Sequence, residues 1–498
     1  PAGAAVLGAA PTGGGGADAP EVVPMADAGD VFDVIVIGAG PAGETVAARV
    51  VRGGLTAAVV EERLAGGECS YYACIPSKAL LRPVGLAAEV RRMPGLELRG
   101  AIDTAAVLAR RDEAVSHLDD GGQVSWIESV PAVFVRGRGR LAGPLRVDVT
   151  RPEGGVRALR ARHAVVIATG GDPLIPAIPG LREARPWTNR EATSVRRVPK
   201  RLIVIGGGPV ACEMAQALHA LGAEETTMLV RGDRLLGRVE PFAGELLADS
   251  LRRSGIDLRF GCTPVRAERP VPGGPVTVHA GDGSVVEADE ILVATGRVPA
   301  VAGIGLETVG LEGRGPITVD ASMRAIGVPG GWLYAVGDVN GRNRLTHMGK
   351  YQARVCGDVI VARATGTPDD LPGLRDIADD LGAPQVIFTD PEICAVGRTE
   401  SQARADGFRV RAVEYDMGAV AGAYLQADGY TGRAKAVVDE DRRVLLGVTF
   451  AGPGVADLLH AATIAVTAEI PLDRLWHAVP AFPTVSEIWL RLLEEYGL

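Results

Sequence analysis

The fold of this chain can be predicted from residues 32–43, which read Phe32-Asp-Val-Ile-Val-Ile-Gly-Ala-Gly-Pro-Ala-Gly43. Phe32 to Ile37 has the continuous apolar pattern of a buried parallel strand, and Glu44 to Arg52 is rich in helix-forming residues. A strand, a turn of spaced glycines and a helix, in that order, open the phosphate-binding end of a βαβ unit. The folded part of the chain is therefore predicted to begin with a parallel α/β domain.

Each glycine of this turn has its own task. Gly38 permits the sharp turn, Gly40 lets a pyrophosphate approach the helix amides, and Gly43 allows the helix to pack against the strand. Glycine turns also occur for structural reasons alone, so a second signal is needed. The next strand, Ala57 to Val60, ends in Glu61, where a carboxylate can accept hydrogen bonds from an adenosine ribose. The turn and the acid together predict a bound dinucleotide.

The same pattern occurs a second time along the chain. Arg201 to Ile205 reads as a strand, Gly206-Gly-Gly-Pro-Val-Ala211 as the turn, and a helix runs from about Cys212 to Leu221. Gly206 and Gly208 are the expected cofactor-binding glycines of this turn. Two such units imply two dinucleotides.

The second unit carries an arginine where the first carries an acid. Its strand Thr226 to Val230 ends in Arg231, followed by Arg234 and Arg238. An arginine at this place suits the 2′-phosphate of NADPH. These arginines are alternatively solvated surface charges, so NADH remains open as the coenzyme.

Two short Ala-Thr-Gly segments follow further strands. Ala168-Thr-Gly170 follows Ala164 to Ile167, and Ala294-Thr-Gly296 follows Ile291 to Val293. We expect Gly170 and Gly296 to lie beside the cofactors, where the chain crosses between the nucleotide domains.

A further strand, Trp332 to Val336, runs into Gly337-Asp338. An acid at this strand end can bind the hydroxyls of a flavin's ribityl chain, and its alternative role is that of a helix cap or turn residue.

Composition narrows the classes of partner. The chain has 52 Lys and Arg against 61 Asp and Glu, a formal charge of −9, which argues against nucleic acid. No apolar run is long enough for a membrane span, and no secretion signal opens the chain, so a soluble, cytoplasmic protein is expected. The seven histidines are scattered singly, which gives no support for a metal site.

The segment Gly66-Gly-Glu-Cys-Ser-Tyr-Tyr-Ala-Cys-Ile-Pro-Ser-Lys78 carries the reactive groups. Residues five apart in an ideal helix have Cα atoms roughly 8 to 9 Å apart, beyond the reach of a disulfide. A bridge between Cys69 and Cys74 therefore requires a distorted turn between them. Pro76 suits the first turn of a helix, which places Cys74 at the positive end of its dipole and favours a thiolate. Cys69 is then the outer sulfur, available to an incoming thiol or acceptor.

From about Val31 to the C-terminus, these motifs resemble those of the pyridine nucleotide-disulfide oxidoreductases, the family of dihydrolipoyl dehydrogenase, glutathione reductase, mercuric reductase and soluble transhydrogenase. The two spaced cysteines followed by Ile-Pro-Ser-Lys, and the order of the glycine motifs, carry the likeness. The resemblance implies FAD, NADPH or NADH, and a homodimer. It also implies that Lys78 pairs with Glu213 beside the flavin, where hydride arrives from the nicotinamide.

One departure from the family pattern lies near the C-terminus. Disulfide reductases of this family have a His-Pro-Thr segment with a Glu a few residues later, and this chain has Phe482-Pro-Thr-Val-Ser-Glu487. Phenylalanine cannot move a proton, so the acid–base role toward the outer thiol is vacant, and Glu487 lacks the histidine it would orient. His477 is a possible substitute, although a lone histidine is more often structural. Mercuric reductase uses a C-terminal cysteine pair, which Glu494-Glu-Tyr-Gly-Leu498 does not offer.

The expected fold is α/β, with two Rossmann-like dinucleotide-binding domains and a C-terminal α+β dimerisation domain. From Gln385 onward, alternating strands such as Ala434 to Val438 and Leu445 to Phe450 precede helices at about Val455 to Thr467 and Val485 to Tyr496. The expected division is a disordered extension over 1–28, an FAD-binding domain over 29–167 and 297–375, an NAD(P)-binding domain over 168–296, and the dimerisation domain over 376–498.

Three functions are compatible with these residues. The first is an FAD-dependent NAD(P)H oxidoreductase that passes electrons through the Cys69–Cys74 disulfide to a small acceptor. The second is a quinone reductase, diaphorase or transhydrogenase that works directly from the flavin. The third is a catalytically silent FAD-binding dimeric scaffold, against which the intact cysteine pair and Lys78 argue.

Overall fold

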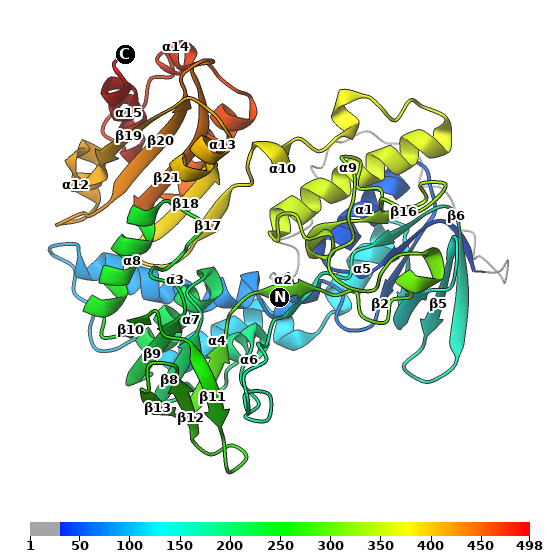
Figure 1. The fold of residues 1–498 in the computed structure, drawn as a ribbon, viewed down its shortest axis with the longest axis horizontal. Coiled ribbons are helices and arrows are strands. Elements are labelled where there is room, and N and C mark those ends of the chain that lie inside the picture. Colours follow the sequence, from blue (N-terminus) through cyan, green and yellow to red (C-terminus); the bar gives the residue numbers. More distant parts are fainter. Residues whose placement is uncertain (1–29) are drawn as a thin grey trace. The chain divides into compact units, whose positions relative to one another are not determined.

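The computed structural model describes residues 30–498, and the expected extension over 1–28 lies outside the described residues. The chain forms two compact units, each assembled from three separate segments (Figure 1). The first unit contains residues 30–75, 112–172 and 297–377, and the second contains residues 76–111, 173–296 and 378–498.

The first unit is built on a seven-stranded sheet in which β1 (Val31–Ile37) lies between β2 (Ala57–Glu61) and β6 (Val156–Ile167). These strands are parallel and carry β-branched residues that are almost fully buried, as expected for a sheet covered on both faces. The remaining strands are β3 (Val133–Arg136), β4 (Arg138–Leu141), β5 (Arg146–Thr150) and β16 (Leu333–Ala335).

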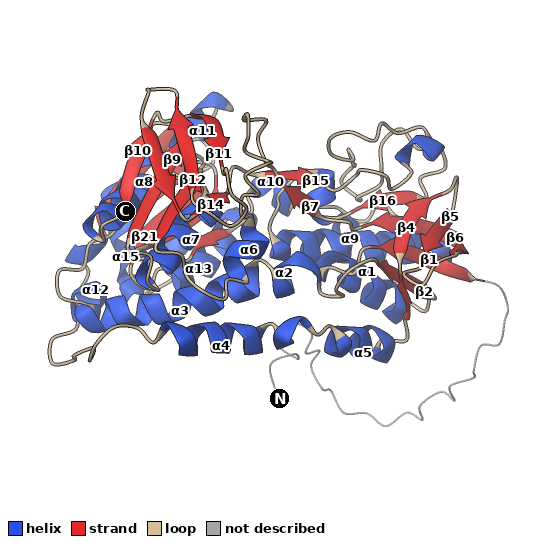
Figure 2. Ribbon diagram, turned by 90° about the horizontal axis from the view of Figure 1, so that it is seen from below, coloured by secondary structure: helices blue, strands red, loops and turns tan. Residues whose placement is uncertain are grey.

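Two helices lie side by side against this sheet, α1 (Pro41–Arg52) and α9 (Thr346–Thr365) (Figures 1 and 2). An ion pair between Arg49 and Asp358 joins them. The helices α4 (Thr104–Ala114) and α5 (Gly121–Ser129) precede β3, and the short strands β7 (Gly171–Pro173) and β15 (Arg297–Pro299) pair with each other.

The second unit contains a four-stranded parallel sheet in the order β10-β9-β8-β14. Its first strand, β8 (Arg201–Ile205), has the predicted bounds and runs into α7 (Pro209–Ala220). The other elements of this part are β9 (Glu225–Val230), α8 (Pro241–Arg253), β10 (Asp257–Phe260), β14 (Glu290–Val293), and the antiparallel strands β11 (Pro264–Glu268), β12 (Val276–Ala280) and β13 (Val285–Ala288).

The C-terminal part of the second unit is a five-stranded antiparallel sheet in the order β17-β18-β21-β20-β19, partly covered by helices. Its strands are β17 (Gln385–Ile387), β18 (Glu392–Gly397), β19 (Val410–Asp416), β20 (Arg433–Asp439) and β21 (Val444–Gly452). Its helices are α11 (Glu400–Ala405), α12 (Ala421–Gln426), α13 (Leu459–Thr467), α14 (Leu472–Leu475) and α15 (Ile488–Tyr496).

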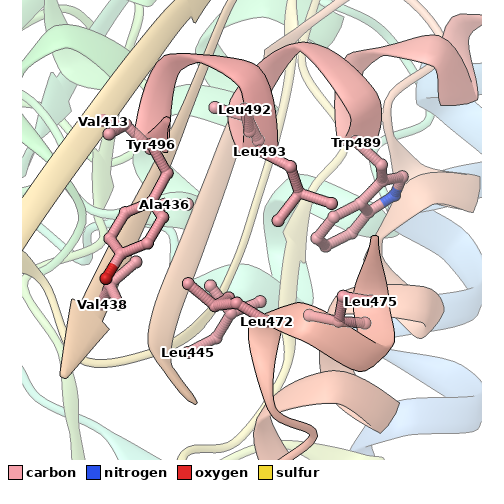
Figure 3. A pocket seen from close by; sticks show the side chains of 10 residues that line it. All are labelled: Val413, Ala436, Val438, Leu445, Leu472, Leu475, Trp489, Leu492, Leu493 and Tyr496. Atoms are coloured by element: carbon pink, nitrogen blue, oxygen red, sulfur yellow. The ribbon is translucent and has the colours of Figure 1, made fainter. Parts of the chain in front are cut away.

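A shallow pocket lies where α15 packs on this sheet (Figure 3). It is lined by apolar side chains such as Leu445, Leu472 and Leu493, together with Trp489 and Tyr496. None of the predicted site residues lines it, so we attribute it to imperfect packing of the helix on the sheet.

The predicted fold class is confirmed, and the differences concern where elements begin. The strand expected over Ala164–Ile167 begins at Val156, because its first half pairs in antiparallel fashion with β5. The expected C-terminal helix opens with the 3₁₀ turn η7 (Val485–Glu487) before α15. Among the described residues, no helix is long and apolar enough to cross a membrane.

Candidate functional site

The first glycine turn joins β1 to α1 and leaves room beside the helix amides. Gly38 has a φ of +107°, and a Cβ on Gly43 would lie only 1.9 Å from the carbonyl oxygen of Gly38. A Cβ on Gly40, in contrast, would meet no atom of residues 30–498 within 4 Å. Gly40 is the N-cap of α1, and no side chain of these residues caps this helix end. The free space and the uncapped amides suit an anion such as a pyrophosphate.

Glu61 lies at the end of β2 beside this turn. Its carboxylate accepts hydrogen bonds from the backbone N–H of Ala39 at 2.8 Å and of Arg63 at 2.7 Å. Burial raises the pKa of Glu61, and the two backbone donors oppose this rise. The predicted ribose-binding acid is therefore fixed against the glycine turn by its own hydrogen bonds.

The strand ends at Gly170 and Asp338 meet in the same unit. Gly170 has a φ of +75°, and Asp338 lies on the 3₁₀ turn η3 (Gly337–Asn340) after β16. The Asp338 carboxylate is 3.6 Å from the guanidinium of Arg297, and desolvation by burial raises the pKa of Asp338. The guanidinium of Arg297, which no sequence motif marks, also lies 3.7 Å from Glu68.

The cysteine motif occupies two helices with a break between them. Cys69, expected to be the accessible outer sulfur, is buried on α2 (Gly67–Tyr71) in the single chain, and Cys74, the first residue of α3 (Cys74–Arg91), is the more exposed of the two. The chain leaves helical geometry between these elements, as a bridge between the cysteines requires, and Pro76 lies in the first turn of α3 as expected. The Cys74 sulfur is 3.4 Å from the Thr346 hydroxyl at the start of α9.

Lys78 and Glu213 form the expected ion pair in the second unit. The Lys78 ammonium is 2.8 Å from the Glu213 carboxylate, whose side chain is only 6% exposed. The other Glu213 oxygen accepts a hydrogen bond from the backbone N–H of Phe388, and the Lys78 ammonium lies 4.9 Å from the centre of the Phe388 ring. A carboxylate, a backbone donor and an aromatic ring thus hold one ammonium group in place.

The second glycine turn repeats the geometry of the first. Gly206 has a φ of +134°, and a Cβ there would lie 2.4 Å from the carbonyl oxygen of Ala294. A Cβ on Gly208 or on Gly296 would meet no atom of the described part of the chain within 4 Å. Arg231 follows β9 directly and is exposed. The open space at Gly208 and Gly296 suits a second dinucleotide, and Arg231 places a positive charge at the end of β9.

Glu487 near the C-terminus has one oxygen with a partner and one without. Its Oε1 is 2.5 Å from the guanidinium of Arg491, one turn further along α15. Its Oε2 is buried and has no hydrogen-bond partner among residues 30–498. Phe482 is 76% exposed, and His477 is also exposed, so neither is packed against this carboxylate in the interior.

Four residues that contact the predicted site residues were missed from the sequence: Arg297, Thr346, Phe388 and Arg491. Thr346 and Phe388 lie 272 and 175 residues from the side chains they contact, and no short motif marks either of them. Arg491 is four residues from Glu487, a helical spacing from which the pair was predictable.

Comparison with known proteins identifies the family of this chain. Residues 32–353 match the family described as pyridine nucleotide-disulphide oxidoreductase, and residues 383–492 match its dimerisation domain. A dihydrolipoyl dehydrogenase of Chlamydia muridarum is 30% identical over 469 residues, which are 92% of this chain and 96% of that protein. A mercuric reductase of Staphylococcus aureus is 29% identical over 462 residues, which are 92% of this chain and 81% of that protein.

Solved structures show the same likeness. LpdA of Mycobacterium tuberculosis has a TM-score of 0.79 and 26% sequence identity, over 93% of this chain and 100% of that one. The HOCl-induced flavoprotein disulfide reductase RclA of Escherichia coli, at 23% identity, has the same TM-score and shares the fold. The chain belongs to the pyridine nucleotide-disulphide oxidoreductases, enzymes that use FAD and NAD(P)H as cofactor and substrate.

Proposed function

We propose that this enzyme passes two electrons from NAD(P)H through FAD to a Cys69–Cys74 disulfide, and from the resulting dithiol to a small acceptor. The position of Cys74 carries this proposal. It is the first residue of α3, where the helix dipole favours a thiolate, and its sulfur lies beside the Thr346 hydroxyl. The reduction of the disulfide consumes one hydride from NAD(P)H and one proton, and leaves two thiols.

The first unit is the proposed FAD site. The amides at Gly40 would bind the pyrophosphate, Glu61 the adenosine ribose, and Asp338 the ribityl hydroxyls. The open space at Gly40 and the uncapped start of α1 support this placement. Bound FAD supplies the two-electron chemistry, and these side chains fix its position.

Glu61→Arg is expected to weaken FAD retention. The substitution removes the acceptor for the Ala39 amide and places a cation at the adenosine end. The ratio of flavin to protein after gel filtration measures this effect. Its neighbour Glu62, which is exposed, provides the control variant Glu62→Arg, which should keep its flavin. Full flavin occupancy in Glu61→Arg would mean that FAD binds elsewhere.

Lys78 and Glu213 are proposed to adjust the charge where the nicotinamide delivers its hydride. Glu213 neutralises much of the Lys78 charge, and the Phe388 ring and amide hold the pair in one geometry. A fixed dipole of this kind stabilises charge that moves during hydride transfer, because it need not reorganise.

Arg231 is proposed to contact the 2′-phosphate of NADPH. Arg231→Glu should then raise the KM for NADPH far more than the KM for NADH. For a charge-assisted contact, this difference corresponds to a free energy on the order of 2 to 3 kcal/mol. Steady-state kinetics with both coenzymes measure the difference. Arg253→Glu, at an exposed position of α8, is the control for a general change of surface charge. Equal effects of Arg231→Glu on both coenzymes would exclude the contact.

The enzyme is proposed to act as a homodimer in which the C-terminal domain of one subunit closes the disulfide site of the other. The match of residues 383–492 to a dimerisation domain supports this assembly. In it, the partner subunit's Phe482 would face Cys69. The residue that transfers protons in the family's dithiol enzymes would then be replaced by an apolar ring.

A second function, direct reduction of a quinone or of another nicotinamide by the flavin, is favoured by the same exposed Phe482. An apolar ring suits a flat acceptor better than it suits a thiol that must lose a proton. Rates with a small disulfide and with a quinone, measured at equal flavin content, separate the two functions. A disulfide rate well above the quinone rate supports the first, and the reverse supports the second.

A further inference from the structure

Glu44 is a buried acid that the proposed reaction does not use. It lies in α1 one turn beyond Gly40, to whose carbonyl its own N–H donates a hydrogen bond of 3.0 Å. The residue is 8% exposed. Its Oε1 is buried and has no hydrogen-bond partner within the described part of the chain. A carboxylate in such a place is strongly disfavoured relative to the neutral acid.

The groups around Glu44 come from three other elements. Lys350 on α9 favours the anion, whereas Glu61 at the end of β2 opposes it. Tyr71 on α2 stays neutral, because burial and the nearby acids raise its pKa to about 12. The Arg49–Asp358 ion pair lies further along α1 and α9 and is neutral as a pair. Burial outweighs the attraction of Lys350 and raises the pKa of the Glu44 carboxyl to about 8.

We propose that Glu44 takes up a proton when FAD binds, so that the affinity for FAD falls as the pH rises above neutrality. The inference rests on the FAD position proposed above, with the pyrophosphate at Gly40. The pyrophosphate carries two negative charges and would lie about one helical turn from this carboxyl, whose Oε1 accepts no hydrogen bond from the residues that the structure describes. Like charges at this distance in a partly buried site disfavour ionisation of the carboxyl. The proton comes from solvent, and no bond in FAD changes.

The sign of the pH dependence follows from the direction of the shift. In the flavin-free protein the folded state binds the Glu44 proton more tightly than the unfolded chain, whose ordinary value is 4.5. The stabilisation from the neutral acid is therefore complete below about pH 4.5 and is lost as the pH rises toward about 8. Bound FAD would raise the pKa of Glu44 in the folded protein further. At a pH between the pKa of the flavin-free protein and this higher pKa, FAD binding is accompanied by the uptake of a proton.

The test is calorimetric titration of the full-length, flavin-free protein with FAD, in two buffers of different ionisation enthalpy, at pH 7 and pH 9. The wild type should take up almost no proton at pH 7 and most of one proton at pH 9. The affinity of the wild type for FAD, divided by that of Glu44→Gln, should be about tenfold lower at pH 9 than at pH 7. Glu44→Gln keeps the shape of the neutral acid, so it should match the wild-type affinity at pH 7 and lack this uptake at pH 9.

The exposed Glu128 on α5 provides the matched control, since Glu128→Gln should behave as the wild type at both pH values. Equal proton uptake by the wild type and Glu44→Gln would overturn the proposal. So would a wild type without uptake at pH 9, which would mean that Lys350 holds Glu44 as an anion. If Glu44→Gln does not fold, the wild-type uptake at the two pH values decides alone. An error in the FAD position would instead show as full flavin retention by Glu61→Arg.

Discussion

Phe482→His is expected to raise turnover with a dithiol or disulfide substrate by about 10²- to 10⁴-fold, the usual contribution of a well-placed general base. In the family pattern the histidine is paired with a glutamate, and this chain already has that glutamate, Glu487. Glu487 has a buried oxygen with no hydrogen-bond partner in the described chain, five residues from the substituted position. By the family resemblance, Glu487 would orient an imidazole at position 482 and fix its tautomer. Arg491 binds the other oxygen and need not be displaced.

The rate at which NAD(P)H reduces the flavin should hardly change in this variant, because that half-reaction needs no proton transfer at residue 482. Single-turnover reduction and steady-state turnover with dihydrolipoamide and glutathione disulfide measure the two halves separately. Val479→His is the control, since Val479 is 84% exposed and lies three residues earlier. An equal gain in the control, or high dihydrolipoamide activity in the unmodified protein, would contradict the assigned role of Phe482.

Cys74→Ser is expected to reduce disulfide-coupled turnover by about 10³-fold or more, as is usual when a covalent catalyst is removed. The serine hydroxyl stays protonated at neutral pH, so it supplies neither a sulfur for the bridge nor an anion at the start of α3. FAD should remain bound, because its proposed ligands do not include Cys74. Reduction of a quinone directly from the flavin should persist.

The control for Cys74→Ser is Cys262→Ser, at a buried cysteine of the second unit outside the motif. Turnover with small disulfides and flavin content are measured for both variants. Normal disulfide turnover in Cys74→Ser would show that the electrons do not pass through the Cys69–Cys74 pair.

The fold could be predicted because its determinants are local. The turn at Gly38 and the turn at Gly206 each follow an apolar strand directly, and both have the positive φ that only glycine adopts readily. The break between Cys69 and Cys74 followed from the reach of a disulfide and from the preference of Pro76 for a first helical turn.

The immediate surroundings of the site could not be predicted in the same way. Lys78 and Glu213 are 135 residues apart, and only the resemblance to the family suggested their contact. Phe388 reaches the Lys78–Glu213 pair, and Thr346 reaches Cys74, each through the packing of distant segments of its own unit, which leaves no periodic signal in the sequence. The raised pKa of Glu44 follows from its burial in the fold, so its position directly after the glycine turn gave no indication of it.

An anaerobic titration of the wild-type enzyme with NAD(P)H, followed by its absorption spectrum, tests whether electrons reach the disulfide. If electrons pass to the Cys69–Cys74 disulfide, the first two electrons should leave the flavin oxidised beside the Cys74 thiolate. A long-wavelength charge-transfer band should then grow with the first equivalent and be absent in Cys74→Ser. Complete bleaching of the flavin by the first equivalent, without that band, would contradict electron transfer to the disulfide and favour direct reduction of the acceptor by the flavin.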